Sequence, residues 1–173
     1  MKPISIITLP PIRWQEYKEL RLQALKTDPS AFATTYQEDA AMPDQEWQDR
    51  LQNAHGQKSY MLFAENEGRI VGMAGALLYQ GKCVEHIATI VSVYVDIAYR
   101  GQAIAQKLMQ GIMKLLQNDK KIVHVQLTVN TENMAAIKLY EIMGFKRIGI
   151  LEKEVKCGDT FSDSYMMVKV LDK

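Results

Sequence analysis

The chain has 173 residues, 47% of them hydrophobic, which is enough to bury the core of one globular domain. Lys and Arg number 21 against 20 Asp and Glu, so the net charge of +1 provides no broad field to attract nucleic acid or an anionic membrane surface. Near the N-terminus, Pro3, Pro10, Pro11 and Arg13 interrupt any apolar run, so neither a secretory signal nor a membrane span is expected. We expect one domain over residues 1–173, in the cytoplasm, with no nucleic-acid or membrane partner.

The cysteines and histidines do not have the spacing of a metal site. Cys83 and Cys157 also fit no disulfide framework, and His55, His86 and His124 are scattered along the chain. The sequence therefore predicts free thiols and no bound metal.

The spacing of apolar residues predicts the elements of the first half of the chain. In order, it indicates a strand over residues 3–9, a helix over 14–25, a loop over 30–36, a second helix from about 43 to 51, and strands over 59–65 and 69–79. The last two strands flank Gly68, which can adopt the positive φ of a hairpin turn. These two strands are therefore expected to pair antiparallel.

The second half of the chain alternates strands and helices. In order, the pattern indicates a strand over 84–95, a helix over 104–116, a strand over 122–129, a helix over 132–143, and closing strands over 145–151 and 162–170. Gly144 suits the C-terminus of the second of these helices. The whole order of elements predicts a mixed α/β sheet with three antiparallel strands before the helix at 104.

Residues 93–105 form the most informative segment, because a β-branched strand there leads through small residues into an amphipathic helix. Small residues such as Gly101 allow a ligand to approach the backbone, and the first helical turn offers unpaired N–H groups and positive partial charge. Arg100 adds a full positive charge. The segment predicts a phosphate site, although a glycine and an arginine at such a turn also serve packing and capping.

Two motifs in this order resemble the GNAT acetyltransferase superfamily. Val93, Tyr94 and Val95, followed by RGQAIA at 100–105, are similar to the acyl-CoA pyrophosphate loop of that family. NMAAIKLY at 133–140, continuing to Gly144 and Phe145, resembles its N-x-x-A-x-x-L-Y…GF segment. The resemblance implies a single GNAT-like domain of the α/β class. Its central, mostly antiparallel and twisted sheet would have a V-shaped opening and be flanked by helices.

The resemblance also implies acetyl-CoA as cosubstrate. The residues it assigns to binding are Val93, Tyr94, Val95, Arg100, Gly101, Gln102, Ala103, Ile104, Ala105, Gln106, Asn133 and Tyr140. Ala103 departs from the family, which usually has glycine there. Alanine tolerates helical dihedral angles, so the loop N–H groups can still point at phosphate if Ala103 already belongs to the helix. Its methyl group would then cost some affinity by crowding a phosphate oxygen.

The resemblance assigns Tyr140 to catalysis, as the phenol that donates a proton or a hydrogen bond to the departing thiolate. A phenol with a pKa of about 10 is a weaker acid than a thiol with a pKa of about 8.5, so hydrogen bonding is the expected role. The alternative is a helix-face aromatic packed against Ala136 and Met143. Asn133 has two compatible roles, helix capping and a cofactor contact.

The attacking amine must be neutral, yet an amine with a pKa of about 10.4 is almost entirely charged near pH 7, so a base is useful. Glu85 and His86 are the candidates, though each also fits a structural role, and a water chain is the alternative. Thr89 stands where many family members carry glutamate and cannot act as that base. A backbone N–H around residues 93–95 could stabilise the charge on the carbonyl oxygen where sheet pairing is interrupted.

The sequence does not identify the acceptor. Glu38, Asp39, Asp44 and Glu46 could attract a cationic amine or form a solvated acidic surface. The resemblance implies an N-acetyltransferase for a primary amine of a small molecule, by direct attack in a ternary complex. Two alternatives stay open, a protein N-terminal acetyltransferase and a non-catalytic regulatory module that holds CoA without turnover. A homodimer is left open as well.

Overall fold

A twisted sheet divides the molecule into two faces. The computed structural model describes residues 3–52 and 58–172, and across them the sheet has seven strands in the order β1-β2-β3-β4-β5-β7-β6. The strands are β1 (Ser5–Ile7), β2 (Ser59–Asn66), β3 (Arg69–Leu78), β4 (Ile87–Val95), β5 (His124–Asn130), β6 (Lys146–Cys157) and β7 (Thr160–Val170). Neighbouring strands pair antiparallel except β4 and β5, which are parallel. This is the α/β fold class that the sequence predicts.

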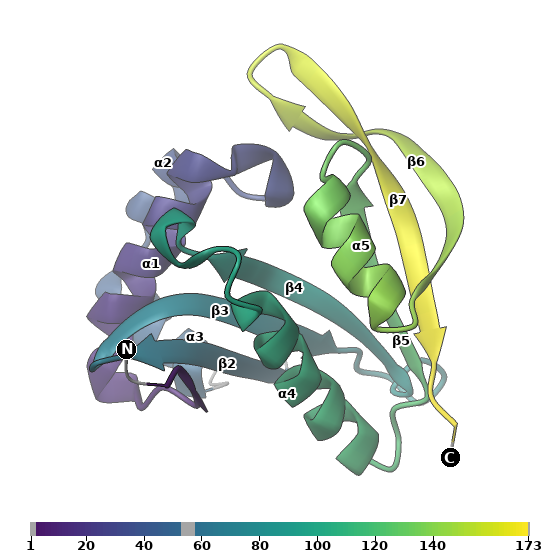
Figure 1. Cartoon of the computed structure of the whole chain (residues 1–173), viewed down its shortest axis with the longest axis horizontal. Helices are drawn as coiled ribbons and strands as arrows, with labels where there is room; N and C mark the ends of the chain where they lie inside the picture. Colours follow the sequence, from purple (N-terminus) through teal and green to yellow (C-terminus); the bar gives the residue numbers. More distant parts are fainter. Residues whose placement is uncertain (1–2, 53–57, 173) are drawn as a thin grey trace.

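Helices cover both faces of the sheet (Figure 1). The α-helices are α1 (Trp14–Thr27), α2 (Tyr36–Ala40), α3 (Asp44–Gln52), α4 (Ile104–Asn118) and α5 (Met134–Ile142), and short 3₁₀ turns are η1 (Pro11–Arg13), η2 (Pro29–Ala31) and η3 (Ile97–Tyr99). Leu108 and Ile112 of α4 belong to a core with Leu62 and other residues on one face. Tyr17 of α1 belongs to a second core, which lies on the other face of the sheet. The alternation of strand side chains explains why the sheet has two apolar faces.

A β-bulge interrupts the pairing of β3 with β4. Gly75 pairs with Val91 and Met73 with Tyr94, so β4 has one more residue than β3 between these pairs. The bulged residue Ser92 has a φ of 57°, in the left-handed region that non-glycine residues rarely adopt. The pairing interruption expected around residues 93–95 is therefore present, beginning at Ser92.

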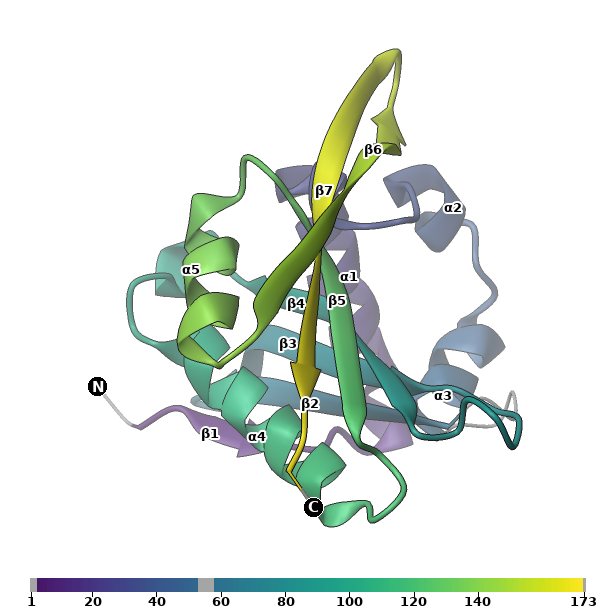
Figure 2. The same ribbon diagram turned by 90° about the vertical axis from the view of Figure 1, so that its right-hand side faces the viewer.

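The V-shaped opening arises where β4 and β5 separate (Figures 1 and 2). The two strands pair only from Ile87 to Thr89, opposite residues 124–126. Beyond Thr89 they diverge, and β5 continues beside β7. The divergence leaves a cleft that contains the bulge in one wall and the end of β5 in the other.

Two differences between prediction and structure are explained by local hydrogen bonds. The sequence predicts a strand from residue 84, but β4 begins at Ile87 because residues 81–86 form a turn in which the N–H groups of Val84 and Glu85 both donate to the carbonyl of Gly81, at 2.9 Å. The loop expected over 30–36 ends in the unpredicted helix α2. A capping box holds its start, with Thr35 and Glu38 each bonding the other's backbone N–H.

The strand expected over 3–9 is shorter in the structure, at Ser5–Ile7, and the strand expected over 145–151 continues to Cys157. The two turn glycines agree with expectation. Gly68 and Gly144 have φ values of 84° and 88°, at the hairpin turn and after α5. Within the described residues, no helix combines the length and the apolar character needed to cross a membrane.

Candidate active site

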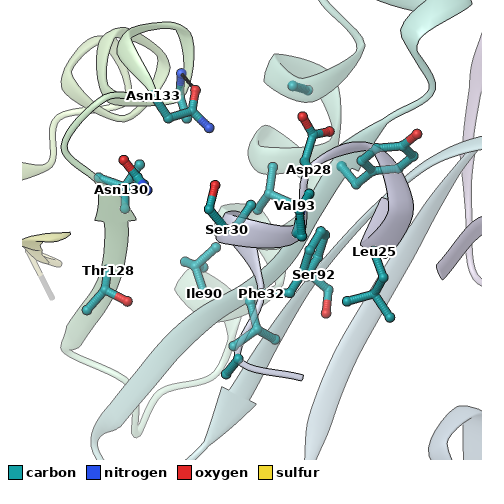
Figure 3. Close-up of a pocket in the computed structure, with 18 of the residues that line it drawn as sticks. Leu25, Asp28, Ser30, Phe32, Ile90, Ser92, Val93, Thr128, Asn130 and Asn133 are labelled. Carbon is teal, nitrogen blue, oxygen red and sulfur yellow. Dashed lines mark hydrogen bonds between the residues drawn. The ribbon is translucent and has the colours of Figure 1, made fainter. Parts of the chain in front are cut away.

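The divergence of β4 and β5 opens a cleft of about 1540 Å³. Figure 3 shows Thr128, Asn130 and Asn133 along one wall, with Ser92, Val93 and Asp28 facing them and Ser30 between. The segment around η2 reaches over this space, since η2 contacts both β5 and β6. The cleft is thus bounded by elements from both halves of the chain.

The loop before α4 lies at one end of the cleft. Ala103 is the residue that caps α4, with φ and ψ of 56° and 21°, and Gly101 has a φ of 80°. Ala103 therefore has a left-handed backbone conformation. The expectation from the sequence assumed that Ala103 already belongs to the helix, and the structure shows that it does not. A left-handed residue is costly for alanine and free for glycine, so backbone conformation explains the family's glycine better than crowding of a phosphate does.

The N-terminus of α4 is available to an anion. The carbonyl of Ala103 accepts the first helical bond, from the N–H of Lys107 at 3.1 Å. Helix geometry leaves the first N–H groups of α4 without an intrahelical partner, and among the described residues no side chain caps them. Ile104, Ala105 and Gln106 all line the cleft. These unpaired donors and the helix dipole favour a phosphate here.

Arg100 lines the same end of the cleft, but its charge already has a partner. Its Nη2 donates to the carboxylate of Asp28, and its Nε donates to the carbonyl of Val95 at 3.0 Å. The guanidinium also lies 5.7 Å from the centre of the Tyr94 ring. These contacts hold the guanidinium beside Asp28, Val95 and Tyr94, and the Asp28 carboxylate balances its charge.

Most of the residues assigned to acetyl-CoA binding line the cleft together. They are Val93, Tyr94, Val95, Arg100, Gly101, Ala103, Ile104, Ala105, Gln106, Asn133 and Tyr140. Gln102 is exposed and lies outside this set. Segments separated by some thirty residues in the chain thus meet around one space.

Asn133 and Tyr140 both lie on α5 or at its start. The side chain of Asn133 accepts a hydrogen bond from the N–H of Ala136 at 3.1 Å, so the capping role is present and the amide still faces the cleft (Figure 3). Tyr140 is 6% exposed and packs edge-on against Phe145, with ring centres 6.1 Å apart. Burial raises the pKa of the Tyr140 phenol well above its usual value. The phenol therefore stays protonated and can donate a hydrogen bond into the cleft.

The structure does not bring Glu85 and His86 to the cleft. Both lie in the turn before β4, at the end of the strand away from the α4 loop, and neither is among the lining residues. Glu85 pairs instead with Lys121, at 2.7 Å. Thr89 does line the cleft, and its hydroxyl accepts a hydrogen bond from Gln126 at 3.2 Å.

Three of the four acidic residues considered for an acidic surface already have bonding partners within the fold. Asp39 is buried and pairs with Arg21 at 2.8 Å, while Glu38 bonds its own helix start. Asp44 pairs with Lys18 at 3.0 Å. The suggestion that Asp39 belongs to a solvated surface is therefore wrong. His55 lies outside the described residues.

Four cleft residues were not singled out from the sequence. Arg21, Asp28, Ser92 and Asn130 all line the cleft, from α1, the turn after it, the bulge and the end of β5. Asn130 is buried, and its side chain accepts from the N–H of Glu132 at 2.8 Å. An arginine on the apolar face of a predicted helix is the one available signal, and it points to Arg21.

Residues 17–145 match the family model described as acetyltransferase (GNAT) family. The chain belongs to the GNAT family. Acetyl-CoA is the cosubstrate of this family, and its members are acyltransferases.

Curated relatives include two N-acetyltransferases. An L-amino acid N-acetyltransferase of Escherichia coli is 29% identical over 127 residues, which cover 73% of this chain and 76% of that protein. An N-alpha-acetyltransferase of Saccharolobus solfataricus is 34% identical over 82 residues, covering 47% of each chain. The names of these two relatives describe different acetyltransferases, so the similarity does not identify one acceptor.

Solved structures show the same GNAT fold. A GNAT-family acetyltransferase from Streptococcus pneumoniae superposes with a TM-score of 0.86 at 24% identity, covering 98% of this chain and all of that one. A phosphinothricin acetyltransferase from Sinorhizobium meliloti, in complex with acetyl-CoA, has a TM-score of 0.82 at 14% identity, over 98% and 89% of the two chains.

Proposed function

We propose that this protein transfers an acetyl group from acetyl-CoA to a primary amine of a small molecule, by direct attack in a ternary complex. One observation carries the proposal. The uncapped start of α4, the bulge of β4 and the Tyr140 phenol all line a single cleft. In this proposal, the cleft would provide a phosphate site, an oxyanion site and a hydrogen-bond donor for the leaving group.

The loop before α4 fits the pyrophosphate of acetyl-CoA. The N–H groups of the first turn would bind its oxygens, and a side chain added at Gly101 would meet no atom within 4 Å, so the loop is open to a ligand. Asn133 and Lys138 face the cleft from α5, where they would provide further polar contacts. We expect Arg100 to contribute part of its charge while it stays paired with Asp28.

Acetyl-CoA supplies the activated acetyl thioester. The amine nitrogen forms the new C–N bond as the C–S bond breaks, the nitrogen loses one proton, and the thiolate gains one. A main-chain N–H at the bulge of β4, near Ser92 and Val93, would stabilise the negative charge that develops on the carbonyl oxygen. The Tyr140 hydroxyl would donate a hydrogen bond to the thiolate.

The proton on the amine would leave through water. Thr89 occupies the place of the family's glutamate, and its hydroxyl is not basic near neutral pH. Glu85 and His86 lie outside the cleft, so they are not proposed as bases. Water in an open cleft of this size is the proposed carrier.

A small amine is the favoured acceptor because η2 lines the cleft and contacts β5 and β6, so that η2 would limit the room for a larger acceptor on that side. The name of the Escherichia coli relative, an L-amino acid N-acetyltransferase, agrees with a small acceptor. The name of the Saccharolobus relative keeps a protein N-terminus as the second candidate.

Mass spectrometry distinguishes these acceptors. The protein is incubated with acetyl-CoA and a mixture of amino acids, other small primary amines and short peptides with free N-termini. The proposal expects one or more small amines to gain the mass of an acetyl group, and the peptides to remain unchanged. If only the peptides are acetylated, the acceptor is a protein N-terminus and not a small molecule. If nothing is acetylated, both acceptor assignments are contradicted.

A further inference from the structure

Arg21 is a buried arginine in the wall of the cleft. It is 7% exposed, yet it lines the cleft. Its Nε donates to Asp39 at 2.8 Å, its Nη2 to the Thr34 hydroxyl at 2.9 Å, and its Nη1 to the Ser92 hydroxyl at 3.3 Å. The planar, five-donor geometry of a guanidinium suits such divided bonding. Arg21 thus joins α1, the segment before α2 and the β4 bulge.

The contact with Ser92 falls on the residue whose conformation creates the bulge. Ser92 has a φ of 57°, and a non-glycine residue pays about 1 kcal/mol or more for this left-handed conformation. Arg21 bonds the side-chain hydroxyl of Ser92, a residue 71 positions later in the sequence. A bond to the hydroxyl favours the rotamer and backbone that Ser92 adopts, and therefore the direction of the N–H groups beside it.

Arg21 is poorly suited to bind an acceptor directly. Its charge is balanced by Asp39, whose side chain is 2% exposed. One face of the guanidinium is covered by the Phe32 ring, with its centre 4.3 Å away. A group fixed on several sides in this way is suited to orienting its neighbours.

We propose that Arg21 is a positioning residue, which acts through Ser92 to hold the β4 bulge with its main-chain N–H directed at the acetyl carbonyl. This inference rests on the proposed acetyl transfer. Arg21 does not touch the reacting atoms, and its effect belongs to the bond-forming step. Asp39 and Thr34 fix the guanidinium so that it reaches Ser92.

The test compares Arg21→Lys, Ser92→Ala, Ser92→Gly, and the two double variants that combine Arg21→Lys with Ser92→Ala or with Ser92→Gly. Lysine keeps the charge beside Asp39 but cannot bond Asp39, Thr34 and Ser92 together. Measured quantities are kcat and KM with an amine found to be acetylated, the acetyl-CoA hydrolysis rate without amine, the Kd for acetyl-CoA and the melting temperature. Arg13→Lys is the control, since Arg13 likewise makes several side-chain hydrogen bonds, to the carboxylates of Glu16 and Glu65, but lies outside the cleft.

Arg21→Lys and Ser92→Ala are each expected to lower kcat and the hydrolysis rate about tenfold, because each removes the bond between residue 21 and the Ser92 side chain, with Kd for acetyl-CoA changed less than about twofold. The double variant with Ser92→Ala is expected to lose no more than either single one, because both remove the same contact. Ser92→Gly is expected to restore part of the loss caused by Arg21→Lys, since glycine adopts the left-handed conformation unaided. A structural role alone would not produce this rescue.

Several results would overturn the inference. If Arg21→Lys raises the KM for the amine and leaves the hydrolysis rate unchanged, Arg21 contacts the acceptor. If Ser92→Ala has a normal kcat, Arg21 does not act through Ser92. Additive losses in the double variant would also contradict it. If Arg21→Lys does not fold, Ser92→Ala and Ser92→Gly still decide, because alanine should lower kcat more than glycine does. A wild-type protein that acetylates nothing overturns the proposed function instead, which separates the two failures.

Discussion

Arg100 donates a hydrogen bond to the carboxylate of Asp28, joining two residues 72 positions apart in the wall of the cleft. The pair links the turn after α1 to the loop before α4. A carboxylate so close to a proposed phosphate site opposes anion binding, because it balances the charge of Arg100 and repels phosphate.

Asp28→Asn is therefore expected to strengthen acetyl-CoA binding, by about threefold at low ionic strength, and the gain should fade at high salt. The amide keeps the shape of the side chain while removing its charge. Isothermal titration calorimetry gives the Kd. Asp44→Asn is the control, because its side chain is 63% exposed and pairs with Lys18 outside the cleft. Weaker binding by Asp28→Asn would mean that Asp28 is needed to place Arg100, and would contradict the repulsion.

The left-handed cap of α4 leads to a prediction about stability. Ala103→Gly is expected to raise the free energy of unfolding by about 1 kcal/mol, or the melting temperature by roughly 2–4 °C, because glycine relieves the strain at a φ of 56°. Ala105→Gly, two residues later inside α4, should lower stability by roughly 0.5–1 kcal/mol. Thermal melts of the two variants should shift in opposite directions. A fall in both would show that Ala103 is not strained.

Burial of the Tyr140 phenol predicts a change of stability with pH. Its pKa is raised in the folded state, while in the unfolded chain it is about 10. Below pH 10 both states keep the proton, so the phenol adds no pH dependence. Above it the unfolded state ionises first, and stability should fall by up to about 1.4 kcal/mol per pH unit.

Urea titrations at neutral and alkaline pH measure this effect. The difference in free energy of unfolding between wild type and Tyr140→Phe should be constant below about pH 10 and should move in favour of the variant above it. Tyr79→Phe, at a side chain that is 43% exposed, is the control. A constant difference throughout would mean that the folded protein ionises Tyr140 as easily as the unfolded chain does.

The buried pair of Arg21 and Asp39 predicts a large loss on truncation. Asp39→Ala leaves a buried guanidinium without its carboxylate and is expected to cost about 3–5 kcal/mol of unfolding free energy. Asp44→Ala removes an exposed partner and should cost less than about 1 kcal/mol. Denaturant titration compares the two. A loss for Asp39→Ala no larger than that for Asp44→Ala would show that the buried pair is not structurally important.

Apolar periodicity was sufficient to predict most of the fold. The apolar spacing that includes Leu108 and Ile112 predicted α4. Gly68 and Gly144 were expected at turns, and both have positive φ angles there. The helix α2 was missed although Thr35 and Glu38 have the spacing of a capping box. With five residues, α2 is too short to show an apolar period.

The loop and the α5 motif were also visible in the sequence, but the rest of the site was not. The left-handed conformation of Ser92 has no signature in a serine, and it arises from the extra residue of β4. The pairing of Arg21 with Asp39 depends on how the chain returns after α1. Glu85 and His86 do not reach the cleft because they lie before the start of β4, at the end of the strand away from the α4 loop.

Acetyl transfer in the cleft is tested most directly by the initial rate of CoA thiol release from saturating acetyl-CoA, with and without each amine of a panel. If the protein transfers acetyl groups, at least one small amine raises the rate well above hydrolysis, and Tyr140→Phe lowers that rate about tenfold or more while its Kd for acetyl-CoA changes less than about twofold. If acetyl-CoA binds and no amine raises thiol release above the hydrolysis rate, the protein holds CoA without transferring its acetyl group, which would contradict the proposed function.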